Sequence, residues 1–379
     1  MTAAYPNITS LSLRKCVAKI SRPEDVGWIL RGAQRGGGGE TISSVDLEGC
    51  DAAVSDADIP ALLDAFSPLT ALTDVALGKC PRLTDKGIAA VAAHPMAASL
   101  EDISVAGCAP GITAAGLAAL TSGKAGAWPK LRRLDVSGCT GIKGSVALPP
   151  RLTVSSLRAM YLPALTALTV LLPAAAPLEQ LLVSECRSLK SLSVSSKRLK
   201  LLNAAGCKQL THLELHCAGL DTLILQHCSH LAAPIAFICP GLRSELIVNG
   251  CTSLTTSALS AMVNGSPELC RLRADGCASL DGDLVLSSRA LREVSVEGCA
   301  RLDGLRVAAP LQALSARACR NLTAVWLYDI VTDGVLRVDV RNCSLLKRLV
   351  GVRAAALEGR LSLDMAGCTS LLKCDDNDS

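Results

Sequence analysis

One apolar pattern that recurs along the chain limits the possible fold more than any other feature. Residues Leu199 to Cys228 contain two copies of L-x-x-L-x-(L/A)-x-x-C-x-x-L, and their cysteines, Cys207 and Cys228, lie 21 residues apart. Similarity at so short a period indicates a solenoid, in which each unit packs on its neighbours, rather than a single globular core. The fold therefore follows from what one unit forms.

The alternation of residues within a unit predicts a short strand. Leu223 and Leu225 are two residues apart, so their side chains lie on the same side of an extended chain. The cysteine three residues later behaves as a small, readily buried side chain with a weak S–H donor. We expect it to fill the turn that ends the strand and to bond a turn carbonyl. Leu231 then returns to the core.

The residue that ends the strand, here called the anchor, can be followed through nearly the whole chain. The cysteine anchors are Cys16, Cys50, Cys80, Cys108, Cys139, Cys186, Cys207, Cys228, Cys251, Cys277, Cys299, Cys319, Cys343 and Cys368. Leu162 fills one more anchor position. The sequence therefore predicts about fifteen units.

The spacing of the anchors predicts the return legs. Up to Cys139 the intervals are 34, 30, 28 and 31 residues, which leaves room for helices. The candidate helices are Pro23–Arg31, Ile59–Phe66, Lys86–His94 and Thr113–Leu120. Later intervals of 20–26 residues predict extended legs, with runs at Leu189–Val194 and Leu210–Leu215 and one late helix at Thr256–Val263. Because a helix is about 10 Å wide and strands stack about 4.8 Å apart, the N-terminal third is expected to curve more strongly.

The pattern resembles the cysteine-containing class of leucine-rich repeats found in F-box and related leucine-rich-repeat proteins. The best matching segments are Val75–Ile88, Leu134–Cys139, Val294–Leu302 and Leu363–Leu371. This resemblance spans about residues 8 to 371 and implies an α/β solenoid, a horseshoe with a parallel sheet on its concave face, and a protein-binding role. The first strand is expected at Leu11–Leu13, which leaves no room for an F-box before the repeats. The later repeats are also shorter than the family's usual unit.

We expect one solenoid over residues 1–374, with long helix-containing repeats in 1–139, compact repeats in 140–374 and an acidic tail at 375–379. Met1 to Ser10 has no basic segment followed by an apolar one. No apolar run reaches the roughly 18 residues of a membrane span. The expected location is cytoplasmic, with nuclear or cytoskeletal placement as alternatives.

Composition and motifs exclude most other function classes. The net charge of +4 comes from mixed signs without a basic block, so neither nucleic acid nor a membrane is an expected partner. The run Gly36–Gly39 lacks the context of a phosphate-binding loop. Residues of metal-ligand type gather only at His212, His216, Cys217, His227, Cys228 and His230, and strand alternation scatters them. No catalytic arrangement can be placed at one site. We therefore expect no enzyme activity, cofactor, metal or small-molecule substrate.

The chain has 18 cysteines, and those at the anchors are interpreted as buried structural thiols in a chain that is not exported. Disulfides are the alternative, because stacked anchors about 5 Å apart satisfy the Cα distance of such a bond. Cys217, Cys239, Cys270 and Cys374 lie off the anchor positions, and Cys374 in the tail is the expected reactive thiol.

The candidate binding surface is the set of outward residues six, four and two positions before each anchor. From Cys277 onward these positions are rich in charge of both signs. Earlier in the chain they turn apolar, and contiguous exposed apolar surface usually marks an interface. The candidate partner-binding residues are Met160, Leu182, Leu201, Ile224, Ile247, Arg271, Arg273, Arg317 and Arg341. A shifted register, or cover by Leu171–Pro177, is the alternative reading of the apolar stripe.

These observations predict a protein-interaction scaffold or adaptor that binds protein partners on its concave face. One alternative is a substrate-recognition subunit acting with a ubiquitin ligase in trans. Another is a structural subunit of a large assembly, for instance a cytoskeletal one. Little sequence is left for polar caps outside Ile8 to Leu371, so we expect a partner or a second copy to cover one end.

Overall fold

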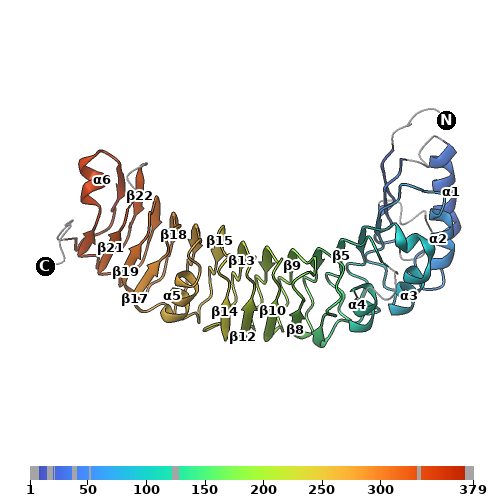
Figure 1. Cartoon of the computed structure of the whole chain (residues 1–379), viewed down its shortest axis with the longest axis horizontal. Coiled ribbons are helices and arrows are strands. Elements are labelled where there is room, and N and C mark those ends of the chain that lie inside the picture. The colour runs from blue at the N-terminus through green and yellow to red at the C-terminus, as the bar shows by residue number, and fades with distance from the viewer. Residues whose placement is uncertain are drawn as a thin grey trace. The chain divides into compact units, whose positions relative to one another are not determined.

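The computed structural model describes residues 8–14, 20, 22–35, 41–50, 53–121, 128–330 and 334–371. The chain divides into two compact units, Met1–Arg187 and Ser188–Ser379. Each unit is a parallel-sheet solenoid in which a main-sheet strand, a turn ending at the anchor and a return leg follow one another (Figure 1). The predicted anchor Cys16, the run Gly36–Gly39, and the tail with Cys374 lie outside the described residues.

The first unit has helices on its early return legs, as the spacing predicted. Its main sheet consists of β1 (Ser10–Ser12), β2 (Ser44–Asp46), β3 (Asp74–Ala76), β4 (Asp102–Ser104), β5 (Arg133–Asp135), β7 (Ser156–Arg158) and β9 (Gln180–Leu182), each parallel to the next. The return legs carry α1 (Pro23–Arg35), α2 (Ile59–Phe66), α3 (Asp85–Ala93), a 3₁₀ turn (Pro95–Ala98) and α4 (Ala114–Thr121), coloured blue to cyan-green in Figure 1. After α4 they become the parallel strands β6 (Gly144–Ala147) and β8 (Leu165–Leu171). All four predicted helices are confirmed, and α1 extends four residues beyond the predicted Arg31.

The second unit is built almost entirely from strands. Its main sheet runs β11 (Leu201–Asn203), β13 (Thr222–Ile224), β15 (Glu245–Ile247), β16 (Arg271–Arg273), β18 (Glu293–Ser295), β20 (Ala313–Ser315), β22 (Leu336–Asp339) and β24 (Leu361–Asp364). The return legs form β10 (Ser191–Ser195), β12 (His212–His216) and β14 (Ala236–Ile238), then β17 (Gly282–Ser287), β19 (Leu302–Ala308), β21 (Ala324–Tyr328) and β23 (Arg348–Val350). The predicted extended legs and the late helix, α5 (Thr256–Asn264), are confirmed. A short helix, α6 (Arg353–Leu357), was not predicted.

The anchor cysteines join successive units through their thiols. At most of the described anchors, the Sγ donates to the carbonyl of the residue three positions before the preceding anchor. The bonds run from Cys108 to Leu77, Cys139 to Val105, Cys186 to Ala159, Cys228 to Ala204, Cys251 to Leu225, Cys277 to Val248, Cys299 to Ala274, Cys319 to Val296 and Cys343 to Ala316, with lengths of 2.9–3.2 Å. Among the described residues, none of these nine thiols forms a disulfide and all nine are buried, whereas the later anchor Cys368 is half-buried. The predicted role of a buried turn donor is confirmed for these anchors.

The residue before the anchor has a left-handed backbone in unit after unit. Glycine takes this conformation at Gly138, where φ is 71°, and at Gly276, where φ is 67°. Residues with a side chain do so elsewhere, such as Glu185 with a φ of 59°. The tight turn into the anchor therefore requires a positive φ but not a glycine.

Acidic side chains join the helix starts of the first unit. The Asp56 carboxylate accepts hydrogen bonds from the Thr84 N–H (2.7 Å), the Thr84 hydroxyl (2.6 Å) and the Gly87 N–H (3.0 Å). Asp85 repeats this contact one unit later, accepting from the N–H of Thr113 at 2.8 Å and from its hydroxyl at 2.5 Å. Each carboxylate thus satisfies donors that the first turn of a helix leaves unpaired.

The parallel-sheet solenoid is confirmed, while the number of repeats, the horseshoe curvature and the domain boundaries stay predictions. Two cysteines that fell off the anchor pattern have a clear place. Cys217 and Cys239 directly follow β12 and β14 and are buried, because the extended return legs form turns of their own. Within the described part of the chain, no helix is long and apolar enough to cross a membrane.

Candidate functional site

The outward face of the main sheet in the second unit is the candidate site. Strand alternation buries the central residue of each strand and turns its neighbours outward. The first row, six residues before the anchors, contains Arg271, Glu293, Ala313, Arg337 and Ser362, which pair strand by strand from β16 to β24. The second row, four before the anchors, contains Arg273, Ser295, Ser315, Asp339 and Asp364. The third row, two before the anchors, contains Asp275, Glu297, Arg317, Arg341 and Ala366.

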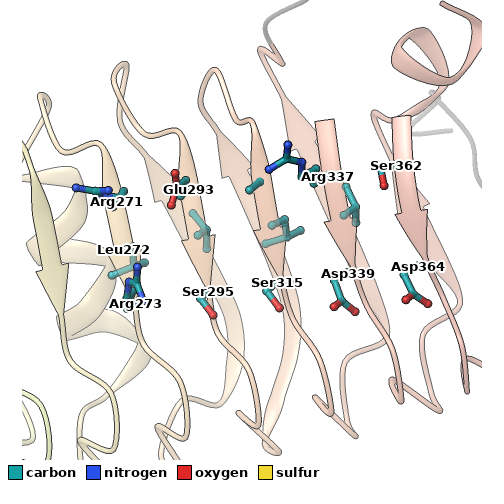
Figure 2. A pocket seen from close by; sticks show the side chains of 14 residues that line it. Arg271, Leu272, Arg273, Glu293, Ser295, Ser315, Arg337, Asp339, Ser362 and Asp364 are labelled. Carbon is teal, nitrogen blue, oxygen red and sulfur yellow. The ribbon is translucent and has the colours of Figure 1, made fainter. Parts of the chain in front are cut away.

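A shallow groove of about 400 Å³ lies over the first two rows (Figure 2). Its floor is low because Ala313, Ser295 and Ser315 have small side chains. Arg271 and Arg273 stand at one end, and Arg337, Asp339 and Asp364 stand on the strands at the other end, as the labelled side chains show. The groove therefore forms because short side chains lie between longer charged side chains at its two ends. The strands beneath it remain regularly paired.

Hydrogen bonds fix the floor from the third row. The Ser295 hydroxyl donates to Asp275 at 2.5 Å, and the Ser315 hydroxyl donates to Glu297 at 2.6 Å. Both serines therefore use their hydroxyl protons within the protein.

An ion-pair ladder continues along the same side of the face. Arg317 lies 3.8 Å from both Glu297 and Asp339, and Arg341 contacts Asp339 at 2.6 Å and Asp364 at 3.2 Å. The hydrogen bond from Arg341 lowers the pKa of Asp339 and raises the pKa of Arg341 itself. These charges are engaged with one another.

The first row is different, because its charges have no such partners. Arg271, Glu293 and Arg337 are exposed, and none of them makes an ion pair within 4.0 Å among the described residues. Arg273, one row away, is held by Glu245 at 2.7 Å. Exposed charges without an intramolecular partner keep their full capacity for a bound molecule.

The four arginines predicted as binding residues therefore have different surroundings. Arg271 and Arg273 line the groove, and only Arg271 lacks an ion-pair partner in the described part of the chain. Arg317 and Arg341 belong to the ladder beside it. Arg337, which is exposed and unpaired among the described residues, was not among the predicted arginines.

The five apolar candidates occupy different rows. In the first unit, Met160 follows β7, and Leu182 pairs with Arg158. In the second unit, Leu201 pairs with Thr222, whereas Ile224 pairs directly with Ile247, and Ile247 pairs with Arg273 of the groove. All five are half-buried. Only Ile224 and Ile247 form a direct apolar pair in these registers; the longer stripe stays a prediction.

The groove floor and a cation–π contact on the return legs were not predicted from the sequence. Small residues four positions before Cys299 and six and four positions before Cys319 were the available signal for the floor. On the return legs, the Arg306 guanidinium lies 3.8 Å from the Trp326 ring centre, and its Nε contacts Asp283 at 3.2 Å. The signal there was Trp326 two residues before Tyr328 in a chain with only 2% aromatic residues. No group of three or more metal-ligand side chains comes together among the residues placed by the structure.

No known protein-family model matches the sequence, and none of the curated proteins is significantly similar to it. Similar solved structures include a leucine-rich repeat protein from Bacteroides ovatus, with 14% identity, a TM-score of 0.40, and coverage of 81% of this chain and 79% of that one. The yeast Rad7 and Elc1 complex has 14% identity and a TM-score of 0.34, with coverage of 72% of this chain and 74% of that one. The complex of TLR13 with ssRNA13 has 12% identity and a TM-score of 0.28, with coverage of 88% of this chain and 64% of that one. By its own strand registers, the described chain is a parallel-sheet solenoid with few helices.

Proposed function

We propose that this chain is a non-enzymatic protein-interaction scaffold that binds its partner on the outward face of the main sheet. The groove between β16 and β24 supports this most directly, since its exposed Arg271, Glu293 and Arg337 are not used by the ion pairs of the described solenoid. Charges placed in this way contribute specificity and association rate to a protein interface. A regular sheet also presents them at fixed spacing.

The apolar residues next to the groove extend the proposed surface. Ile224 and Ile247 lie side by side on β13 and β15, and Ile247 adjoins Arg273. An apolar centre with a polar rim is the usual composition of a protein interface. Leu201 is proposed to contribute to the outward face of the second unit, and Met160 and Leu182 to the outward face of the first.

Affinity purification from cells tests this proposal with two variants that change the face. The first is Ile224→Lys with Leu182→Lys, and the second is Arg271→Glu with Arg337→Glu. A matched control, Arg320→Glu with Arg353→Glu, makes the same change in charge at exposed positions away from the groove lining. We expect both face variants to lose a stoichiometric partner at an unchanged melting temperature, while the control retains it.

The outcome also separates the alternatives. Stoichiometric ubiquitin-ligase components would support the substrate-recognition role. Partner capture that survives both face variants would contradict binding on this face. A large fall in the melting temperature of the lysine variant would place Ile224 and Leu182 in the core instead.

A second candidate function, a subunit of a larger assembly, is favoured by β24. Leu361 and Leu363 are half-buried, whereas Leu336 and Val338, their partners on β22, are buried. Half-exposed core leucines on a strand favour pairing with another chain. Light scattering of the purified protein at high concentration tests this, and a stable, monodisperse monomer would count against it.

A further inference from the structure

The charged side chains in the first row of the groove form a pattern that a partner with complementary charges can recognise. Arg271, Glu293, Ala313 and Arg337 stand on four consecutive strands in direct register. The order along the row is therefore basic, acidic, small, basic. Because the three charged side chains are exposed and make no ion pair among the described residues, the pattern is open to a ligand.

The spacing of this row matches an extended peptide. Strands in a sheet lie about 4.8 Å apart, so three steps place Arg271 and Arg337 about 14 Å apart. An extended peptide advances about 3.3 Å per residue, so residues i and i+4 are about 13 Å apart with their side chains on the same face. Residue i+2 then lies about 7 Å along, within reach of Glu293.

The floor suits close approach by a peptide main chain. Ala313 replaces a charged side chain at the third place in the row, and Ser295 and Ser315 keep the neighbouring row low. Since the two hydroxyls donate to Asp275 and Glu297, the floor keeps a fixed shape. Discrimination between ligands must then come from Arg271, Glu293 and Arg337.

The charge of the groove favours a peptide over nucleic acid. Its charged lining residues are Arg271, Arg273 and Arg337 against Glu293, Asp339 and Asp364, three positive and three negative, so the formal sum is zero. Binding of nucleic acid relies on a net basic surface that neutralises several phosphates. A lining that contains both basic and acidic side chains instead complements a peptide that carries charges of both signs.

We infer that the groove binds an extended peptide segment with two acidic side chains four residues apart and a basic side chain midway between them. The acidic groups pair with Arg271 and Arg337, and the basic group pairs with Glu293. This inference rests on the proposed function and specifies the partner's chemistry at the same site.

The test uses the full chain and fluorescent synthetic peptides. The probe has the pattern Asp-Ala-Lys-Ala-Asp, flanked by glycines, and its control is a scrambled peptide with adjacent aspartates. We expect the patterned peptide to bind at least about threefold more tightly, since three exposed ion pairs are at stake and each contributes only modestly. Its binding should weaken as salt is raised.

Charge reversal supplies the decisive comparison. Arg271→Glu with Arg337→Glu should weaken binding of the patterned peptide about tenfold or more and should favour the peptide Lys-Ala-Lys-Ala-Lys, whose central lysine still pairs with Glu293. The control pair Arg320→Glu and Arg353→Glu should leave both affinities unchanged.

Equal affinity for the patterned and scrambled peptides, no effect of the double reversal, or tighter binding of a single-stranded oligonucleotide would overturn the inference. If the cellular partner is still lost in the face variants, the scaffold function stands without this specificity. If the partner is retained as well, both fail.

Discussion

Replacing a single anchor thiol tests how neighbouring units are held together. Cys228 is fully buried, and its Sγ donates to the Ala204 carbonyl of the preceding unit at 3.2 Å. Cys228→Ala removes one buried heavy atom, worth about 1 kcal/mol, and one hydrogen bond, worth about 0.5–1.5 kcal/mol. A residual cavity adds to this loss. We expect Cys228→Ala to destabilise the protein by about 1.5–3 kcal/mol.

Cys228→Ser separates packing from polarity. The hydroxyl keeps a donor, but the shorter C–O bond places it farther from the Ala204 carbonyl, and a buried hydroxyl with an imperfect partner is costly. The expected loss is about 1–3 kcal/mol. Cys270→Ser is the matched control, because Cys270 is half-buried and its Sγ lies 3.7 Å from the Glu268 carbonyl, only two residues away. That change should stay within about 0.5 kcal/mol.

Urea denaturation followed by circular dichroism measures these differences, and thiol labelling of the native protein checks burial independently. Cys270 should react with a maleimide dye quickly and Cys228 only after unfolding. A loss below about 0.5 kcal/mol for Cys228→Ala, or rapid native labelling of Cys228, would refute the assignment of the anchor as a buried link between units.

Two further predictions follow from the column of thiols and from the helix starts. Burial raises the pKa of Cys251, Cys277 and Cys299 from 9.0 to about 12. The folded state thus holds protons that the unfolded chain releases, and the stabilisation present below pH 9 is lost as the pH rises toward 12. In that window each thiol lowers the free energy of unfolding by up to about 1.4 kcal/mol per pH unit. The urea midpoint should therefore fall steeply above pH 9, and less steeply in Cys277→Ala. A midpoint that does not change with pH would contradict this prediction. Separately, Asp56→Ala leaves donors of Thr84 and Gly87 unpaired and should cost about 1–3 kcal/mol in urea denaturation, whereas the exposed Asp64→Ala should change stability by less than about 0.5 kcal/mol; equal effects would disprove a capping role.

The repeating offsets predicted the fold because each unit obeys a local rule. Leu223 and Leu225 alternate as a strand requires, and Cys228 closes the turn, so the stacking of units follows from one unit. The same reasoning located the extended legs from Leu189 and Leu210.

The site was harder to predict, since it depends on side chains from several units at once. Arg271 and Arg317 both occupy outward positions of their units, yet only Arg317 lies between two carboxylates of neighbouring strands. The groove exists because Ala313 is small while Arg337 beside it is long, and no single unit contains that difference. The capping of Thr84 by Asp56, 28 residues earlier, was likewise invisible to a pattern read one unit at a time.

The left-handed residue before the anchor shows how such a chain can drift in sequence without changing its fold. Glycine occupies the position at Gly49, Gly107, Gly138, Gly206, Gly250, Gly276, Gly298 and Gly367, and residues with side chains occupy it at Lys79, Tyr161, Glu185, His227, Ala318 and Asn342. A left-handed conformation costs an ordinary residue about 1–2 kcal/mol that glycine does not pay. Glycine loses more conformational entropy on folding, which reduces its advantage by about 0.5–1 kcal/mol. Every residue other than glycine at this turn thus lowers the stability slightly, and packing between neighbouring units compensates for the decrease. Substituting glycine at several of these turns should accordingly stabilise the repeat array. The outward rows do not take part in these turns, so their side chains could then be redesigned to bind a new partner.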